Sequence, residues 1–193
     1  MVEAERTRAR IVQAAVDDAS RLGLEGLTIG SLAERLGMSR AGLVGPFGSR
    51  DQLLEAALEH AGAIFRSAVV TPLADLPPGR RRLERLITAW VGYLVDCPFP
   101  GGCFVTAASS ELDGRPGPLR EQLRGIVTYW HEHLAAEVAA AQDEMAGPHR
   151  PPREVATALI GLSMAANQEI QLFEDSSAGA RALKSMRRAA GLD

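Results

Sequence analysis

The stretch that decides the fold is TIGSLAERLGMSRAGLVGPFGSR, residues 28–50. Apolar Leu32 and Leu36 recur at helical spacing, Gly37 interrupts the pattern, and Leu43 resumes it six residues later. Glycine can adopt the left-handed conformation that ends a helix, so the pattern predicts two short helices joined by a tight turn. We therefore expect a helix-turn-helix over residues 28–50.

The start of each predicted helix carries a capping residue. Thr28 and Ser39 precede the two helices, where a side-chain hydroxyl satisfies backbone N–H groups. In a helix-turn-helix the second helix enters the major groove, and a helix N-terminus can bind a phosphate. Arg40 is the one side chain of this helix able to contact guanine through two hydrogen bonds. The predicted DNA-binding residues are Thr28, Ser39, Arg40, Ala41, Gly42, Val44 and Arg50.

Composition gives the chain no overall positive charge. Its 193 residues include 21 Lys and Arg against 24 Asp and Glu, for a net charge of −3. Residues 1–66 hold eight Arg and nine acidic residues, a net charge of −1. Any DNA binding must therefore depend on local contacts. The hydrophobic fraction of 46% is enough to bury a core, in one compact domain or in a small domain plus a larger one.

Cysteine usage and hydropathy predict a cytoplasmic protein with no membrane partner. Two cysteines are too few for a disulfide framework, and no apolar run approaches membrane-spanning length. Cys97 and Cys103 flank a Pro-Gly turn, which leaves a redox switch or a metal pair as alternatives to buried or half-buried thiols. Two thiols without further ligands make a poor metal site, and His131 and His133 point in different directions on a helix. We predict no metal and no cofactor.

Helical periodicity continues through the rest of the chain. Residues 5–22 predict the first helix of a three-helix head. Ser49 and Gln52 have the spacing of a capping box, which starts a fourth helix, residues 49–70, of about five turns. The prolines within residues 71–79 mark a domain boundary. We place a DNA-binding domain at residues 1–48 and a second domain at residues 71–193.

The second domain is predicted to be helical throughout. Amphipathic segments cover residues 80–97, 103–112, 119–138, 151–173 and 178–190. The predicted fold class is therefore all-α, with a three-helix head and a larger C-terminal domain for ligand binding and dimerisation. Ala158, Gly161 and Ala165 form a second, small-residue face beside the core face of their helix. Two apolar faces need two partners, so the last two helices are the expected homodimer interface.

Large and amide side chains on these helices form the candidate ligand site. For any single aromatic residue, a place in the core is the alternative. Amide side chains on an otherwise apolar helix need hydrogen-bond partners when they are buried, and a ligand could supply them. These amides could instead pair across a dimer. A mostly apolar pocket with a few amides suits a neutral or weakly polar organic effector. The candidates are Trp90, Tyr93, Phe104, Trp130, Met164, Asn167, Gln168 and Gln171.

Two further patterns bear on function. The arginine cluster at residues 80–85 could attract an anion or DNA, and a solvated helix start is the interpretation we favour. No catalytic set is recognisable, since the sequence has no nucleophile triad, phosphate-binding glycine loop or paired acids in a known motif. The sequence therefore predicts that the protein is not an enzyme.

Residues 6–58 closely resemble the head of the TetR family of bacterial transcriptional regulators. Gly23, Thr28, Gly37 and Phe47 all fall in register with that family. The resemblance implies an all-helical homodimer whose two heads enter successive major grooves of double-stranded operator DNA. It also implies a C-terminal domain that binds a small organic effector.

The chain departs from the family pattern at the end of the second helix. Family members usually carry an aromatic residue at the position of Val44 and bulky residues at those of Gly45 and Pro46, where phosphate contacts are made. Because proline restricts the residue before it, we expect Pro46 to push Gly45 out of helical geometry and the helix to end near Val44. Backbone contacts would then come from Thr28, Ser39, Arg40 and Arg50.

Together these features predict a one-component transcription factor, a ligand-responsive repressor in which the fourth helix transmits the effector signal. The alternative is a helical ligand-binding or interaction protein that has lost specific operator binding. The near-neutral head and the substitutions at residues 44–46 motivate this alternative.

Overall fold

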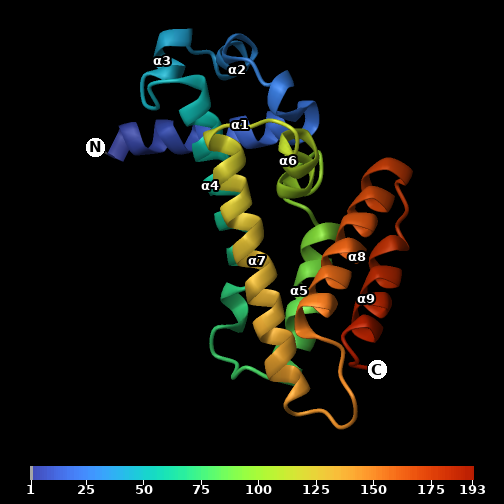
Figure 1. Ribbon diagram of the computed structural model, residues 1–193. Helices are drawn as coiled ribbons and strands as arrows, with labels where there is room; N and C mark the ends of the chain where they lie inside the picture. Colours follow the sequence, from blue (N-terminus) through green and yellow to red (C-terminus); the bar gives the residue numbers. More distant parts are fainter. Residues whose placement is uncertain (1) are drawn as a thin grey trace. The chain divides into compact units, whose positions relative to one another are not determined.

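The computed structural model describes residues 2–193, and these residues form helices without any strand (Figure 1). The predicted all-α class is confirmed. In chain order the elements are α1 (Val2–Gly26), α2 (Ile29–Leu36), α3 (Arg40–Val44), α4 (Arg50–Val69), the 3-10 turn η1 (Thr71–Leu73), α5 (Arg80–Val95), α6 (Phe104–Leu112), α7 (Pro118–Gln142), α8 (Pro152–Phe173) and α9 (Ala178–Ala189).

The chain divides into two compact units. One comprises residues up to 64 together with 99–124, and the other comprises 65–98 together with 125–193. The first unit therefore contains α6 and the N-terminal parts of α4 and α7 in addition to the helix-turn-helix. This division follows compactness, whereas the boundary that we predicted after residue 48 concerns DNA binding and stays a prediction.

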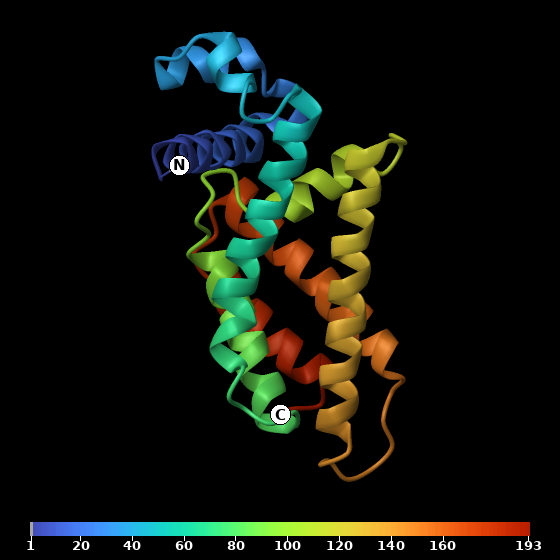
Figure 2. The same cartoon turned by 90° about the vertical axis from the view of Figure 1, so that its left-hand side faces the viewer.

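In the first unit, α2 and α3 lie on the same side of α1 (Figures 1 and 2). Ile11, Leu32 and Leu43 are fully buried and form the core between these helices. Gly37 has a φ of 65°, the left-handed conformation predicted for the turn. The first helix was predicted to end before Gly23, and its helical geometry does break there. Gly23 has a φ of 76°, which a residue with a side chain rarely adopts, and α1 continues after this kink to Gly26.

The start of α4 partly matches its predicted capping box. The Gln52 N–H donates to Ser49 Oγ at 3.1 Å, as expected for a cap. The Gln52 side chain was expected to accept from the Ser49 backbone N–H, and its Oε1 lies 3.4 Å from the Ser49 hydroxyl instead. The helix was predicted over residues 49–70 and extends from Arg50 to Val69.

Helix α6 packs on α1 within the first unit. The Gly101 N–H, just before α6, donates to Ser20 Oγ at 3.2 Å. A Cβ atom on residue 101 would lie 1.8 Å from the Ser20 carbonyl oxygen. The chain can therefore approach α1 this closely only because residue 101 is glycine.

In the second unit, α5, α8 and α9 pack on one another, and α8 lies beside α9 (Figure 1). Arg181 of α9 donates to both Glu169 and Asp175 at 2.7 Å, which fixes the connection between α8 and α9. The hydrogen bond from Arg181 to Asp175, together with those from the Ser177 side chain and backbone, holds the pKa of Asp175 far below its usual range. Within residues 2–193 no helix is both long and apolar enough to cross a membrane.

Candidate nucleic-acid interface and ligand site

The recognition helix α3 is capped as predicted. The Gly42 N–H donates to Ser39 Oγ at 3.0 Å, and in the preceding helix the Ser31 N–H donates to Thr28 Oγ1 at 3.1 Å. Arg40, Ala41 and Gly42 are exposed, whereas Leu43 is fully buried. The N-terminal half of α3 is therefore available to a nucleic acid while its other face anchors it in the core.

Helix α3 ends at Val44 as predicted, but the reason that we gave for it is wrong. Gly45 has helical angles of φ −45° and ψ −47°, and its N–H donates to Ala41 O at 2.8 Å. Pro46 does not displace Gly45, because glycine lacks the Cβ atom that would clash with the proline ring. The chain turns after Pro46, where the Phe47 and Gly48 N–H groups donate to Val44 O.

An open hollow of about 560 Å³ lies beside Gly45 and Pro46, against the first turns of α1. Val44 is half-buried. Gly45 and Pro46 are exposed, and neither has a long side chain that could reach out from this surface. The hollow therefore lies at the C-terminal end of α3, at the two positions where the family pattern has bulky side chains and this chain has Gly45 and Pro46.

The Arg40 side chain lies over the first turn of α2. A Cβ atom on Gly30 would be 3.1 Å from Arg40 Nη2 and 3.6 Å from its Cζ. Thr28, which caps α2, and Ser39, which caps α3, are both exposed. The structure thus brings the start of α2 and the start of α3 together around one exposed guanidinium.

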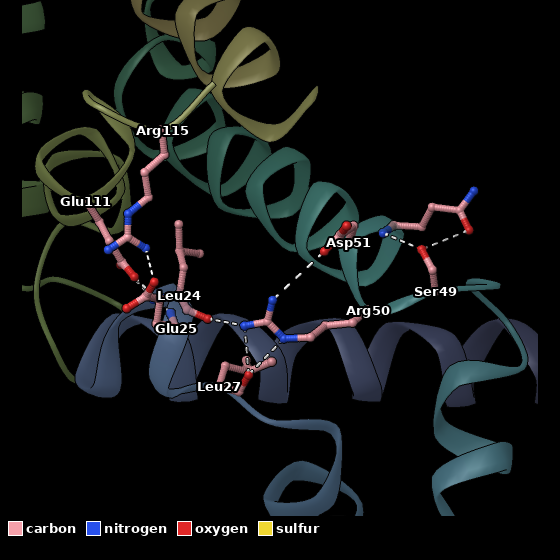
Figure 3. A network of polar contacts seen from close by, with 9 residues as sticks. Leu24, Glu25, Leu27, Ser49, Arg50, Asp51, Glu111 and Arg115 are labelled. Atoms are coloured by element: carbon pink, nitrogen blue, oxygen red, sulfur yellow. Dashed lines mark hydrogen bonds and ion pairs between the residues drawn. The ribbon is translucent and has the colours of Figure 1, made fainter. Parts of the chain in front are cut away.

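Arg50 holds the connection between α1 and α2 (Figure 3). Its Nη2 donates to Leu24 O at 2.6 Å and to Leu27 O at 3.1 Å, and its Nε donates to Leu27 O at 3.2 Å. Its Nη1 lies 3.9 Å from Asp51 Oδ1. Two of its three nitrogens therefore donate hydrogen bonds within the head, and the third forms a long ion pair with Asp51. The predicted contact of Arg50 with DNA stays a prediction.

Glu111 of α6 holds the same connection from another helix (Figure 3). Its carboxylate accepts the N–H groups of Leu24 at 2.7 Å and Glu25 at 2.8 Å, and Arg115 forms an ion pair with Glu25. Glu111 was not predicted from the sequence. The kink at Gly23 was the available signal, because a break in a helix releases N–H donors that need an acceptor.

Three of the eight predicted ligand-site residues form an aromatic cluster in the second unit. Trp90 and Tyr93 of α5 and Trp130 of α7 surround Phe65, the first residue of this unit. The ring centroids of Phe65 and Trp130 are 4.8 Å apart, those of Trp90 and Trp130 are 5.0 Å apart, and those of Phe65 and Tyr93 are 5.1 Å apart. All these pairs are edge-to-face, a favourable arrangement for aromatic rings. Phe65 was not among the predicted ligand-site residues.

The other five candidates lie elsewhere. Phe104 belongs to the first unit, where it is buried beside Phe99. On α8, Asn167 is half-buried, whereas Met164, Gln168 and Gln171 are exposed in the single chain. Their predicted contact with a ligand is untested.

A buried polar cluster lies on α5 and α7. Arg82 Nη2 lies 3.0 Å from Glu137 Oε1, and His133 Nε2 lies 3.8 Å from the same oxygen. Glu137 is 6% exposed, and the Arg82 side chain is 17% exposed. The interpretation of the arginine cluster as a solvated helix start is therefore wrong for Arg82, whose partner Glu137 follows 55 residues later and could not be identified from sequence.

Burial lowers the pKa of His133 below 6.5; the charge of Arg82 acts in the same direction, and Glu137 opposes both. His133 also stacks on Tyr129, with 6.1 Å between the ring centroids. Because the imidazole resists protonation in the folded state, His133 is neutral at pH 7.

We expect His133 to make the protein less stable in mild acid. As the pH falls through about 6.5, the unfolded chain takes up a proton at this position while the folded chain does not, so unfolding is favoured. The melting temperature should therefore fall between pH 7.5 and pH 5.5, and by less in His133→Gln. Removal of the exposed His149 by the same substitution is the matched control, and an equal fall in wild type and His133→Gln would contradict the prediction.

Neither cysteine thiol is strongly exposed, since Cys97 is half-buried and Cys103 is buried. Among residues 2–193, no group of three or more His, Cys, Asp or Glu side chains is placed to hold a metal ion.

Comparison with known sequences identifies both parts of the chain. Residues 11–57 match the family described as bacterial regulatory proteins, tetR family. Residues 79–186 match the family described as tetracyclin repressor-like, C-terminal domain. No curated protein matches the chain.

Solved structures with the same fold cover nearly the whole chain. A TetR transcriptional regulator from Chloroflexus aurantiacus has 22% identity and a TM-score of 0.86, with 99% of this chain and 96% of that chain covered. A putative transcriptional regulator from Saccharomonospora viridis, solved with choline, has 19% identity, a TM-score of 0.79 and 95% of each chain covered. AibR, solved with isovaleryl coenzyme A and operator DNA, has 18% identity and a TM-score of 0.71, covering 91% of this chain and 95% of that one.

The capped, exposed recognition helix and the matched head define a helix-turn-helix transcriptional regulator that binds DNA. The chain belongs to the TetR family, as the resemblance of residues 6–58 indicated. Regulators of this family are generally non-enzymatic transcription factors.

Proposed function

We propose that this protein is a ligand-responsive repressor that acts in the cytoplasm as a homodimer on double-stranded operator DNA. The observation that carries the proposal is the N-terminal half of α3, which is capped by Ser39 and exposed at Arg40, Ala41 and Gly42. Arg40 would contact base edges, and the starts of α2 and α3 would bind phosphates. We propose no catalytic role.

Two structural neighbours support an effector-controlled mechanism. One was solved with isovaleryl coenzyme A and operator DNA together, and another was solved with choline. In this chain, Leu24 is held by α4 through Arg50 and by α6 through Glu111. We propose that α4, which continues into the second unit, carries the effector signal to this connection and so changes the position of the recognition helix.

Arg40→Ala should weaken operator binding by about 1 to 3 kcal/mol, which corresponds to a factor of roughly 5 to 150 in the dissociation constant. The loss should be confined to operators that keep the contacted base pair, because a bidentate contact discriminates between bases. A gel shift at fixed salt concentration measures the dissociation constants of the variant and the wild type for operator DNA. Arg21→Ala, at an exposed position on α1, is the matched control. Equal affinities of Arg40→Ala and wild type would exclude Arg40 as a base contact.

The proposed dimer uses an exposed stripe on α8. Gly161, Ala165, Gln168 and Leu172 repeat at helical spacing and are exposed, and Leu172 is 66% exposed. The other face of α8 is buried, with Val155, Leu159 and Ala166 among its residues. Small and apolar residues on the free face permit a second copy to approach closely.

Ala165→Glu should convert the dimer to a monomer, because two carboxylates would meet near the two-fold axis of a closely packed interface. Light scattering after size exclusion measures the mass. Ala107→Glu, at an exposed position on α6, introduces the same side chain away from α8 and should leave the mass unchanged. A dimeric Ala165→Glu variant would place the interface elsewhere.

A second candidate function is a helical ligand-binding or interaction protein without operator binding. The missing side-chain volume at Gly45 and Pro46 and the net charge of −1 over residues 1–66 favour it. The two candidates differ in salt dependence, since specific phosphate contacts make DNA affinity fall as salt rises. Absent or salt-insensitive DNA binding would favour the second candidate.

A further inference from the structure

We infer that Arg82, Trp130, His133 and Glu137 form the polar end of the effector site, and that the effector is a neutral molecule with a hydroxyl or carboxamide group on an apolar body. The inference rests on the proposed function, because it names the chemistry of the molecule to which the regulator responds. We refer to these four residues as the polar cluster.

Each member of the polar cluster has a buried polar atom without a hydrogen-bond partner in the described part of the chain. The atoms are Arg82 Nε, Trp130 Nε1, His133 Nε2 and Glu137 Oε2. A buried polar atom without a partner destabilises the protein, so a molecule that satisfies it gains affinity. An apolar molecule of the same shape gains nothing from these atoms.

The charges of the polar cluster balance. Arg82 is paired with Glu137, and His133 is neutral because burial disfavours its protonated form. A buried cation or anion added to this pair would have no opposite charge to compensate its desolvation. The polar cluster therefore selects against charged ligands.

The unsatisfied atoms require a ligand group that can both donate and accept. An indole N–H can only donate, and an ionised carboxylate can only accept. Trp130 Nε1 therefore needs an acceptor, while Glu137 Oε2 needs a donor. A hydroxyl or a primary amide supplies both, whereas a hydrocarbon supplies neither.

The same tryptophan provides the apolar side of the site. The ring of Trp130 packs edge-to-face against Phe65 and Trp90, and its centroid is 5.6 Å from that of His133. Trp130 thus connects the aromatic cluster to the polar cluster. A ligand that reaches its N–H would place its body against aromatic rings, which favours an aromatic or aliphatic body.

The test uses five one-ring probes on the full-length protein: benzyl alcohol, benzamide, toluene, benzoate and benzylammonium. The chain has two tryptophans, so ¹⁵N-labelled protein gives two indole N–H resonances, which Trp90→Phe assigns. Benzyl alcohol and benzamide should shift the Trp130 resonance saturably and raise the melting temperature. The other three probes should bind at least tenfold more weakly.

Two variants test the roles of the individual atoms. Glu137→Gln leaves the Arg82 charge without its partner, so this variant should bind benzoate in preference to benzyl alcohol. Glu132→Gln, on the exposed face of α7, should bind the five probes with the same order of affinities as the wild type. Trp130→Phe removes the N–H and keeps an aromatic ring, so benzyl alcohol should bind roughly tenfold more weakly while toluene is unaffected. If Glu137→Gln does not fold, Trp130→Phe still tests the inference.

The inference is overturned if no probe shifts the Trp130 resonance, which would mean that the polar cluster holds only water. It is equally overturned if toluene or a charged probe binds the wild type as tightly as benzyl alcohol. Operator binding is measured by gel shift without any probe. A failure of the proposed function would therefore appear separately from a failure of this inference.

Discussion

Arg50→Met is expected to lower the free energy of unfolding by about 3 kcal/mol, because hydrogen bonds to a charged group contribute about 1.5 to 3 kcal/mol each when their partners are buried. Methionine keeps the length and much of the apolar surface of the side chain but donates nothing. The carbonyl groups of Leu24 and Leu27 would lose their shared donor. The position of α2, which begins two residues after Leu27, would then be poorly defined.

A urea titration measures the stability of Arg50→Met, and a gel shift measures its operator affinity. Arg66→Met makes the same substitution at an exposed position on the same helix and should change stability by less than about 0.5 kcal/mol. If the two variants are equally stable, Arg50 does not hold the connection between α1 and α2. Normal stability of Arg50→Met with lost operator binding would instead support its direct contact with DNA.

Gly101→Ala is expected to have an effect of similar size, about 3 kcal/mol, which is the upper part of the range for inserting a methyl group into a tightly packed site. The added Cβ would lie 1.8 Å from Ser20 O and 2.2 Å from Ser20 C. Both are backbone atoms of α1, so no side-chain rotation relieves the clash. The segment before α6 would have to move away from α1, and the hydrogen bond from Gly101 to Ser20 Oγ would be lost.

The loss of stability in Gly101→Ala is measured as a fall in melting temperature, with thermal unfolding monitored by circular dichroism. Gly92→Ala is the matched control, because a Cβ at this position in α5 has no neighbouring atom within 4 Å. Alanine replaces glycine inside a helix there, so stability should rise by about 0.5 to 1 kcal/mol. Equal melting temperatures for Gly101→Ala and wild type would show that α6 does not approach α1 this closely in solution.

The features predicted correctly from sequence depend on neighbours in the chain. The caps at Thr28 and Ser39 and the left-handed Gly37 involve hydrogen bonds that span three to five residues, so residue type and spacing determine them. The end of α3 at Val44 was also predicted, but the effect of Pro46 was not. A rule for residues with side chains was applied to Gly45, which has none.

The features that sequence analysis missed join distant residues. Glu111 accepts hydrogen bonds from residues 86 and 87 positions earlier, and Glu137 pairs with Arg82 across two helices. Helical periodicity marks which positions are buried but not which helices they meet. For the same reason the sequence grouped Phe104 with Trp90 and Trp130, whereas Phe104 packs beside Phe99 in the other unit.

Footprinting on the promoter of the protein's own gene tests the central claim most directly. We expect protection of two symmetric half-sites about one or more helical turns apart, at about 10 base pairs per turn, with affinity that falls steeply as salt rises. Protection should weaken in Arg40→Ala and disappear in Ala165→Glu. The absence of protection by a folded, dimeric wild-type protein at low salt would contradict the account.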